Sequence, residues 1–139
     1  AASLAAYASE REYSLGLFSN GSPILADRPM NIPPARSPEQ LTIILEALAT
    51  IRPLPVGPMA LQLTRKPRQF PIGATLVIVA SLISDDMVEA FLNLKRQGYE
   101  LVVVHVGHRE CPDLPEGILV HRLNDYLEKM ELAGDFRPA

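Results

Sequence analysis

The most constraining feature of the chain is an unbroken apolar run, Ala74-Thr75-Leu76-Val77-Ile78-Val79-Ala80. It is rich in β-branched residues, and Pro71, Gly73 and Ser81 bound it. Because polar and apolar residues do not alternate, the run predicts a strand buried on both faces, typical of the centre of a parallel sheet. A second apolar run, residues 101–106, follows after a stretch with helical character, so we expect a βαβ unit.

The N-terminal half predicts a helix, a hairpin and a second helix. Residues 1–11 are rich in alanine and favour a helix, and the alternating residues 13–18 favour a strand. Asn20-Gly21 is typical of a type I′ turn, so residues 22–26 are expected to return antiparallel as an edge strand. Ser37 is predicted to cap the next helix, with Pro38 in its first turn.

The remaining elements follow from apolar periodicity and breaker residues. They are a proline-rich loop over 27–37, helices over 37–51, 58–65, 84–97 and 124–132, and strands over 100–106 and 117–121. Together the elements predict a single α/β domain, a three-layer sandwich whose mostly parallel sheet carries an antiparallel edge hairpin. A central strand before the first helix is missing, so we expect unpaired edges and self-association. The chain begins in helical stride without Met, so we interpret it as a truncated piece of a longer protein.

Composition limits the function classes. A net charge of −3 and a pI near 5.6 do not indicate nucleic-acid binding. The single cysteine, Cys111, allows no intrachain disulfide. The sequence holds no run of about 18 apolar residues that would indicate a membrane span. We therefore expect this fragment to be cytoplasmic and to make no membrane contact.

Polar residues follow the first apolar run, at the end where α/β sheets place ligands. They are Ser81, Ser84, Asp85 and Asp86. One interpretation is helix capping, because Ser and Asp are preferred at helix N-termini; the other is a ligand or partner surface, with Arg36 as a further partner contact. A third hypothesis is a small hydrolase-like α/β enzyme using this end of the sheet. Ser81 would be its nucleophile and His105 or His108 its base, although Gly-x-Ser-x-Gly is absent.

A histidine and cysteine pattern marks the second run and the loop after it. His105, His108 and Cys111 have His-x-x-His-x-x-Cys spacing, and His121 lies on the last predicted strand. Imidazole and thiolate are zinc ligands. The alternative is a half-buried, hydrogen-bonded His105 followed by a surface loop.

Several stretches resemble a known family. They are residues 1–7, 13–21, 32–41, 44–49, 71–79 and 96–99. By these stretches the chain resembles the C-terminal two-thirds of a von Willebrand factor A-like domain, and more closely family fifty-eight of the bacterial domains of unknown function. The resemblance covers nearly the whole chain but includes no catalytic motif.

The resemblance implies a non-enzymatic interaction or scaffold module without a cofactor. Members of this family are often encoded beside MoxR-type AAA+ ATPases, which makes such an ATPase the implied partner. Some members carry transmembrane helices upstream of this region, so the resemblance is compatible with a membrane anchor in the parent protein. The metal-binding Asp of von Willebrand A domains would fall on Leu82, and the metal-binding Thr near Gly57-Pro58, so no metal site is expected.

Overall fold

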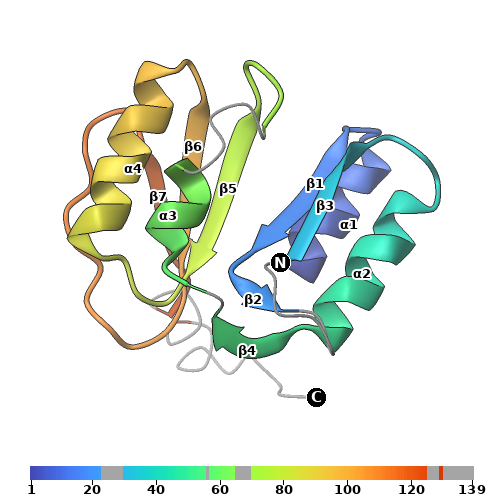
Figure 1. The fold of residues 1–139 in the computed structure, drawn as a ribbon, viewed down its shortest axis with the longest axis horizontal. Helices are drawn as coiled ribbons and strands as arrows, with labels where there is room; N and C mark the ends of the chain where they lie inside the picture. Colours follow the sequence, from blue (N-terminus) through green and yellow to red (C-terminus); the bar gives the residue numbers. More distant parts are fainter. Residues whose placement is uncertain (23–29, 56, 65–69, 125–128, 130–139) are drawn as a thin grey trace. The chain divides into compact units, whose positions relative to one another are not determined.

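The computed structural model describes residues 1–22, 30–55, 57–64, 70–124 and 129. It is a mixed α/β structure whose contacts group into two compact units, residues 1–65 and residues 66–139. The two units are described separately below (Figure 1).

The unit 66–139 contains the predicted βαβ arrangement. Strand β5 (Thr75–Ala80), helix α4 (Asp85–Arg96) and strand β6 (Glu100–His105) follow in order, and β7 (Leu119–Arg122) completes a parallel sheet of order β5-β6-β7. Residues in register share a face: Val77 pairs with Val102, and Val102 with Leu119. The prediction of a parallel strand pair with a crossover helix is confirmed.

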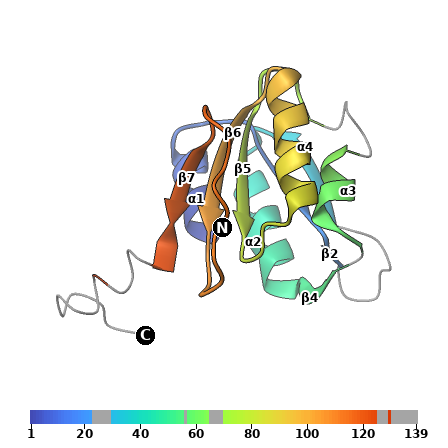
Figure 2. The same ribbon diagram turned by 90° about the vertical axis from the view of Figure 1, so that its left-hand side faces the viewer.

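The prediction that residues 74–80 form a central strand buried on both faces is wrong for this sheet. The central strand is β6, where Leu101 and Val103 are fully buried, and β5 lies at the edge. On β5, Val77 is 47% exposed and Val79 37% exposed. Helix α4 packs against one face of the sheet (Figure 2). The exposed valines of β5 lie on the other face, which no helix among the described residues of this unit covers.

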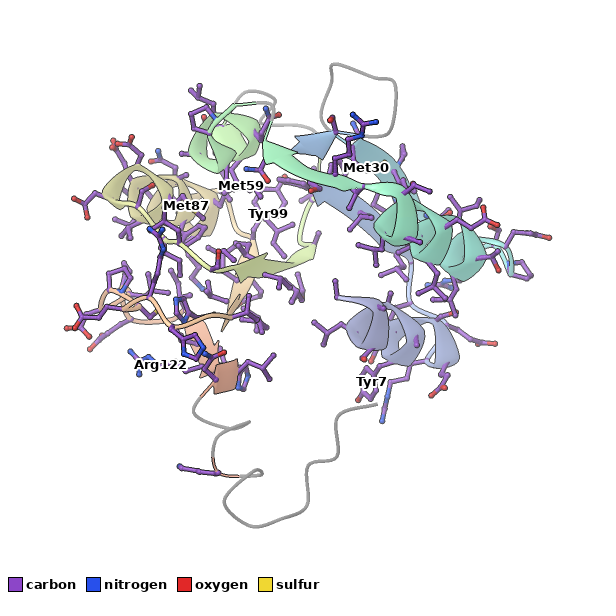
Figure 3. The ribbon with its side chains drawn as sticks, turned by 90° about the horizontal axis from the view of Figure 1, so that it is seen from below. Tyr7, Met30, Met59, Met87, Tyr99 and Arg122 are labelled. Carbon is purple, nitrogen blue, oxygen red and sulfur yellow. The ribbon has the colours of Figure 1, made fainter. Side chains whose placement is uncertain are left out.

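Helix α4 has the ends that its sequence predicts. The Ser84 side chain accepts a hydrogen bond from Met87 N–H, and Asp85 and Asp86 occupy the first turn. At the other end Gly98 adopts φ +94, with Gly98 N–H bonded to Lys95 O and Tyr99 N–H to Leu94 O, a Schellman motif. The buried stripe consists of Met87, Ala90, Phe91 and Leu94. Met87 points toward the sheet in Figure 3.

The unit 1–65 is built on a short antiparallel pair. Strand β1 (Leu15–Ser19) pairs with β3 (Met30–Ala35), and β2 (Gly21–Ser22) pairs with β4 (Arg52–Pro55). Helix α1 (Ala2–Glu10) packs on α2 (Gln40–Thr50), and both helices contact β1. Helix α3 (Met59–Thr64) ends the described part of the unit and confirms the short helix predicted over 58–65.

The hairpin predicted at Asn20-Gly21 is wrong. Strand β1 pairs with β3, and Gly21 and Ser22 pair with β4 instead of returning along β1. Gly21 does not have positive φ, as a type I′ turn would require. A Cβ at Gly21 would lie 2.8 Å from the Arg52 carbonyl oxygen. The glycine therefore allows close approach of two backbones; residues 23–26 lie outside the described residues.

The loop predicted over 27–37 is also partly wrong, because residues 30–35 form β3 with Pro33 and Pro34 inside it. Proline is tolerated there because the described β1–β3 sheet has two strands, each of them an edge. The predicted cap at Ser37 does not form, because α2 begins after Glu39 and has no side-chain cap. Gln40 begins α2, is 6% exposed, and donates from Nε2 to Leu15 O (2.7 Å) and Pro33 O (3.0 Å).

At the C-terminal end the last strand is confirmed but begins two residues later than predicted. Gly117 adopts φ +86 in the turn before β7. Of the helix predicted over 124–132, residues 125–128 and 130–132 lie outside the described residues, as does the whole segment 134–139.

Candidate functional site

The unit 66–139 has an open depression at the carboxyl end of its parallel sheet, where such sheets place ligands. Strand β6 ends at His105 and β7 at Arg122, two residues that are in register. The depression has a volume of about 610 Å³. Its lining consists of His105, Gly107, His108, Arg109, Glu110, Cys111, Pro112, Asp113, Arg122 and Asn124. A volume of this size is in the range of small-molecule sites.

One wall is held by hydrogen bonds from Asn124. Its Oδ1 accepts from Gly107 N–H at 3.0 Å, and its Nδ2 lies 3.1 Å from His108 Nδ1. The backbone N–H can only donate, so Oδ1 is the acceptor and Nδ2 is the donor. His108 Nδ1 must then accept, which leaves the ring proton on Nε2. Gly107 has φ +103, a value that glycine adopts without strain.

His105, at the end of β6, is a buried residue of the same lining. It is 3% exposed, and its Nε2 has no hydrogen-bond partner among the described residues. An unsatisfied buried polar atom costs about 1–3 kcal/mol. Such groups in folded proteins often mark a bound water, an ion or a functional role. The predicted alternative of a satisfied, half-buried histidine is therefore wrong: His105 is buried, and its Nε2 has no hydrogen-bond partner among the described residues.

The rim carries charges of both signs. Arg109, Arg122, Glu110 and Asp113 are all exposed. None of them takes part in the ion pair found among the described residues, which joins Lys95 Nζ to Glu100 Oε2 at 3.4 Å. Figure 3 shows Arg122 at the end of β7. The guanidinium groups of both arginines are thus available to a ligand.

The residues singled out at the end of β5 lie beside this depression but do not line it. Ser84 caps α4, which confirms the capping interpretation for that residue. Ser81 is exposed, and its Cβ lies 3.5 Å from where a Cβ on Gly107 would be. Asp85 and Asp86 are exposed in the first turn of α4. Arg36 is exposed and belongs to the other unit.

The structure does not gather a zinc site or a catalytic pair. Within the described ranges, no group of three or more His, Cys, Asp or Glu residues could hold a metal ion, so His105, His108 and Cys111 are not assembled as ligands. The hydrogen bond of His108 is to Asn124, and none joins Ser81 to a histidine. The Cys111 thiol contacts the Pro112 carbonyl oxygen at 3.6 Å.

Sequence reasoning missed Arg122 and the bridging role of Asn124. The available signal was that His105 and residue 122 end two consecutive parallel strands, whose carboxyl ends share one edge of a sheet. The register that pairs them depends on the turn at Gly117, which the sequence did not fix.

No family model matches the chain, and no curated protein or solved structure matches it either. The von Willebrand A-like resemblance therefore depends on the sequence stretches alone. In the part of the chain that the structure describes, no helix has the length and hydropathy needed to cross a membrane.

Proposed function

We propose that this chain is a non-enzymatic protein-interaction module that binds its partner through the face of the β5-β6-β7 sheet opposite helix α4. The observation that carries the proposal is a row of apolar side chains in register, exposed on β5 and β7 and half-buried on β6. Val77 (47% exposed), Val102 and Leu119 (57% exposed) lie side by side on three strands. Val79 and Val104 continue the row one step along.

This face is unlike an ordinary solvent-facing surface. Parallel sheets are usually covered on both faces, and a sheet face that meets solvent usually carries polar residues. Here β5 presents Val77 and Val79 outward, and β6 presents Val102 and Val104. Contiguous exposed apolar surface marks protein-binding sites in soluble proteins.

We further propose a von Willebrand A-like fold, whose three-layer sandwich has both sheet faces covered; here the partner would cover the face opposite α4. By resemblance, the first candidate partner is a MoxR-type AAA+ ATPase, and self-association through the same face is a related outcome. The hydrolase-like alternative has less support, because Ser81 has no histidine partner among the described residues.

The test is complex formation between this chain and a MoxR-type AAA+ ATPase encoded in the same genome, measured by size-exclusion chromatography with light scattering. We expect a complex with the natural sequence, and its loss in the double variant Val77→Lys, Val79→Lys. The substitutions place charges on an exposed face, so the fold should be retained.

The matched control is Leu82→Lys, which adds a charge at an exposed apolar residue outside this face. It should leave the complex intact. If the natural chain forms no complex, the ATPase assignment is wrong. If the double variant binds as well as the natural chain, this sheet face is not the interaction surface.

A further inference from the structure

We propose that the depression at the carboxyl ends of β6 and β7 binds a carboxylate group, with His105 at its floor and Arg109 and Arg122 at its rim. This site is separate from the sheet face proposed to bind a partner. The register of the sheet puts His105 on one face and His121 on the other.

The first argument is that a buried nitrogen of His105 has no hydrogen-bond partner. His105 is nine-tenths buried or more, lines the depression, and has no partner for Nε2 among the described residues. Imidazole Nε2 can donate a hydrogen bond in one neutral tautomer or as imidazolium. Because Nε2 has almost no accessible surface, a ligand accepts this bond only after the side chains that cover the nitrogen move aside.

The second argument is the excess of donor groups. The guanidinium groups of Arg109 and Arg122 can only donate, and His108 carries its proton on Nε2 because Nδ1 accepts from Asn124. These three exposed side chains offer N–H groups to a ligand, and His105 is a fourth donor when its Nε2 carries a proton and is uncovered. The acceptors in the lining side chains are chiefly Glu110 and Asp113. A ligand rich in acceptors therefore fits best, and arginine binds carboxylate and phosphate in a bidentate geometry.

The third argument decides between these two anions. Glu110 and Asp113 lie on the same rim, and their charges disfavour a multiply charged ligand. A carboxylate carries one negative charge and matches the two-donor fork of arginine. It can come from a free organic acid or from the C-terminus of a peptide, since both present the same group.

The wall is already formed before any ligand binds. Asn124 bonds both Gly107 N–H and His108 Nδ1, which ties the segment after β6 to the residues after β7. A preformed pocket loses less conformational freedom on binding than a flexible one. Small carboxylates should therefore bind measurably, in the millimolar range.

The experiment is an NMR titration of the whole chain with three probes: acetate, inorganic phosphate, and N-acetyl-alanyl-alanine with a free C-terminus. The readouts are the imidazole nitrogens of His105 and the amide of Gly107. We expect saturable shifts with acetate or with the dipeptide, weaker binding of phosphate, and no response to the dipeptide with an amidated C-terminus. The histidine on the opposite face, His121, serves as the internal control and should not shift.

The relative affinities of the two carboxylate probes distinguish a peptide C-terminus from a free organic acid. Tighter binding of the free dipeptide than of acetate indicates a peptide C-terminus, and equal or tighter binding of acetate indicates a free organic acid. Arg122→Gln should weaken either by about tenfold. Arg96→Gln, at the exposed end of α4, is the matched control and should leave the affinity unchanged.

Three results would overturn the proposal: no saturable shift with any carboxylate, equal shifts at His121, or an Arg122→Gln variant that is well folded and binds as tightly as the natural chain. Tighter binding of phosphate than of acetate would overturn the assignment to a carboxylate. Loss of the AAA+ complex described above would not affect this result, because that test probes a different face.

Discussion

Tyr99 Oη donates a hydrogen bond to the Phe70 carbonyl oxygen at 3.0 Å, across 29 residues of sequence. The two rings also meet edge-on, with centroids 6.0 Å apart and planes at 85°. Both residues are buried. Tyr99 follows the C-terminal turn of α4, and Phe70 precedes β5. This contact therefore joins the segment before β5 to the turn between α4 and β6.

Tyr99→Phe should destabilise the chain by about 1 kcal/mol, because the ring stays packed while the buried Phe70 carbonyl loses this donor. Urea unfolding followed by circular dichroism measures the change. Tyr13→Phe is the control, since Tyr13 is exposed and should lose almost nothing. Equal effects of the two substitutions would show that the buried hydrogen bond contributes no net stability.

Gln40→Ala should be more costly, with a loss of about 2–3 kcal/mol. The Gln40 amide donates to the carbonyls of Leu15 and Pro33, and thereby joins α2 to both strands of the β1–β3 pair. Removing it leaves two carbonyls without this donor. The control is Gln97→Ala at the exposed end of α4. A loss for Gln40→Ala no larger than the control's would contradict this role.

Local signals predicted the βαβ unit well, because the residues that begin and end its helix act through contacts within the helix ends. Ser84, the two aspartates after it and Gly98 act within one turn of the chain, so their roles could be inferred without knowing what packs on the helix. Residues 75–80 and 100–105 were identified as strands for the same reason.

Features set by distant partners could not be predicted. The Asn20-Gly21 pair has the composition of a hairpin turn, but its glycine is needed for close approach to Arg52, 31 residues later. Gln40 matches a capping box, but its amide bonds carbonyls of β1 and β3 instead. The exposed face of β5 could not be predicted because an apolar strand with one exposed face has the same composition as one buried on both, and its edge position depends on which strands pair with it.

The candidate site was found in part. His105 and His108 stood out by residue type, but the zinc hypothesis assumed that Cys111 would converge with them. The chain turns at Gly107, and Asn124 takes the Nδ1 atom of His108 as an acceptor. That bond depends on residues 16 positions apart, so spacing alone could not reveal it.

Gly21→Ala should destabilise the unit 1–65 by about 1–3 kcal/mol, because the new methyl group would lie 2.8 Å from the Arg52 carbonyl oxygen and the backbone must shift. Gly98→Ala should cost about 1–2 kcal/mol for a different reason, the positive φ of the helix C-terminus. Thermal unfolding measures both.

A second substitution separates these two causes. Asparagine tolerates the left-handed conformation, so Gly98→Asn should recover part of the loss seen with Gly98→Ala. Gly21→Asn should recover nothing, because its Cβ meets the same carbonyl. Recovery at Gly21 would contradict the close-approach explanation.

Ser84→Ala should lower stability by about 1 kcal/mol through loss of the cap on α4. Ser81→Ala is the matched control, and should change stability little because Ser81 is exposed before the helix begins. Chemical denaturation of both variants measures the difference. A larger loss at Ser81 would indicate a structural role for it that the hydrogen bonds do not reveal.

Asn124→Asp should move the proton of His108 from one ring nitrogen to the other. An aspartate carboxylate still accepts from Gly107 N–H, so the turn after β6 is kept, but it cannot donate to His108 Nδ1. With an acceptor facing it, Nδ1 must carry a proton. Nitrogen-15 NMR of the imidazole distinguishes the tautomers, and His121 in the same spectrum should not change. Asn124→Ala should instead release both contacts and broaden the Gly107 amide signal. If His108 keeps its proton on Nε2 alone in Asn124→Asp, the hydrogen bond from Asn124 does not set the tautomer.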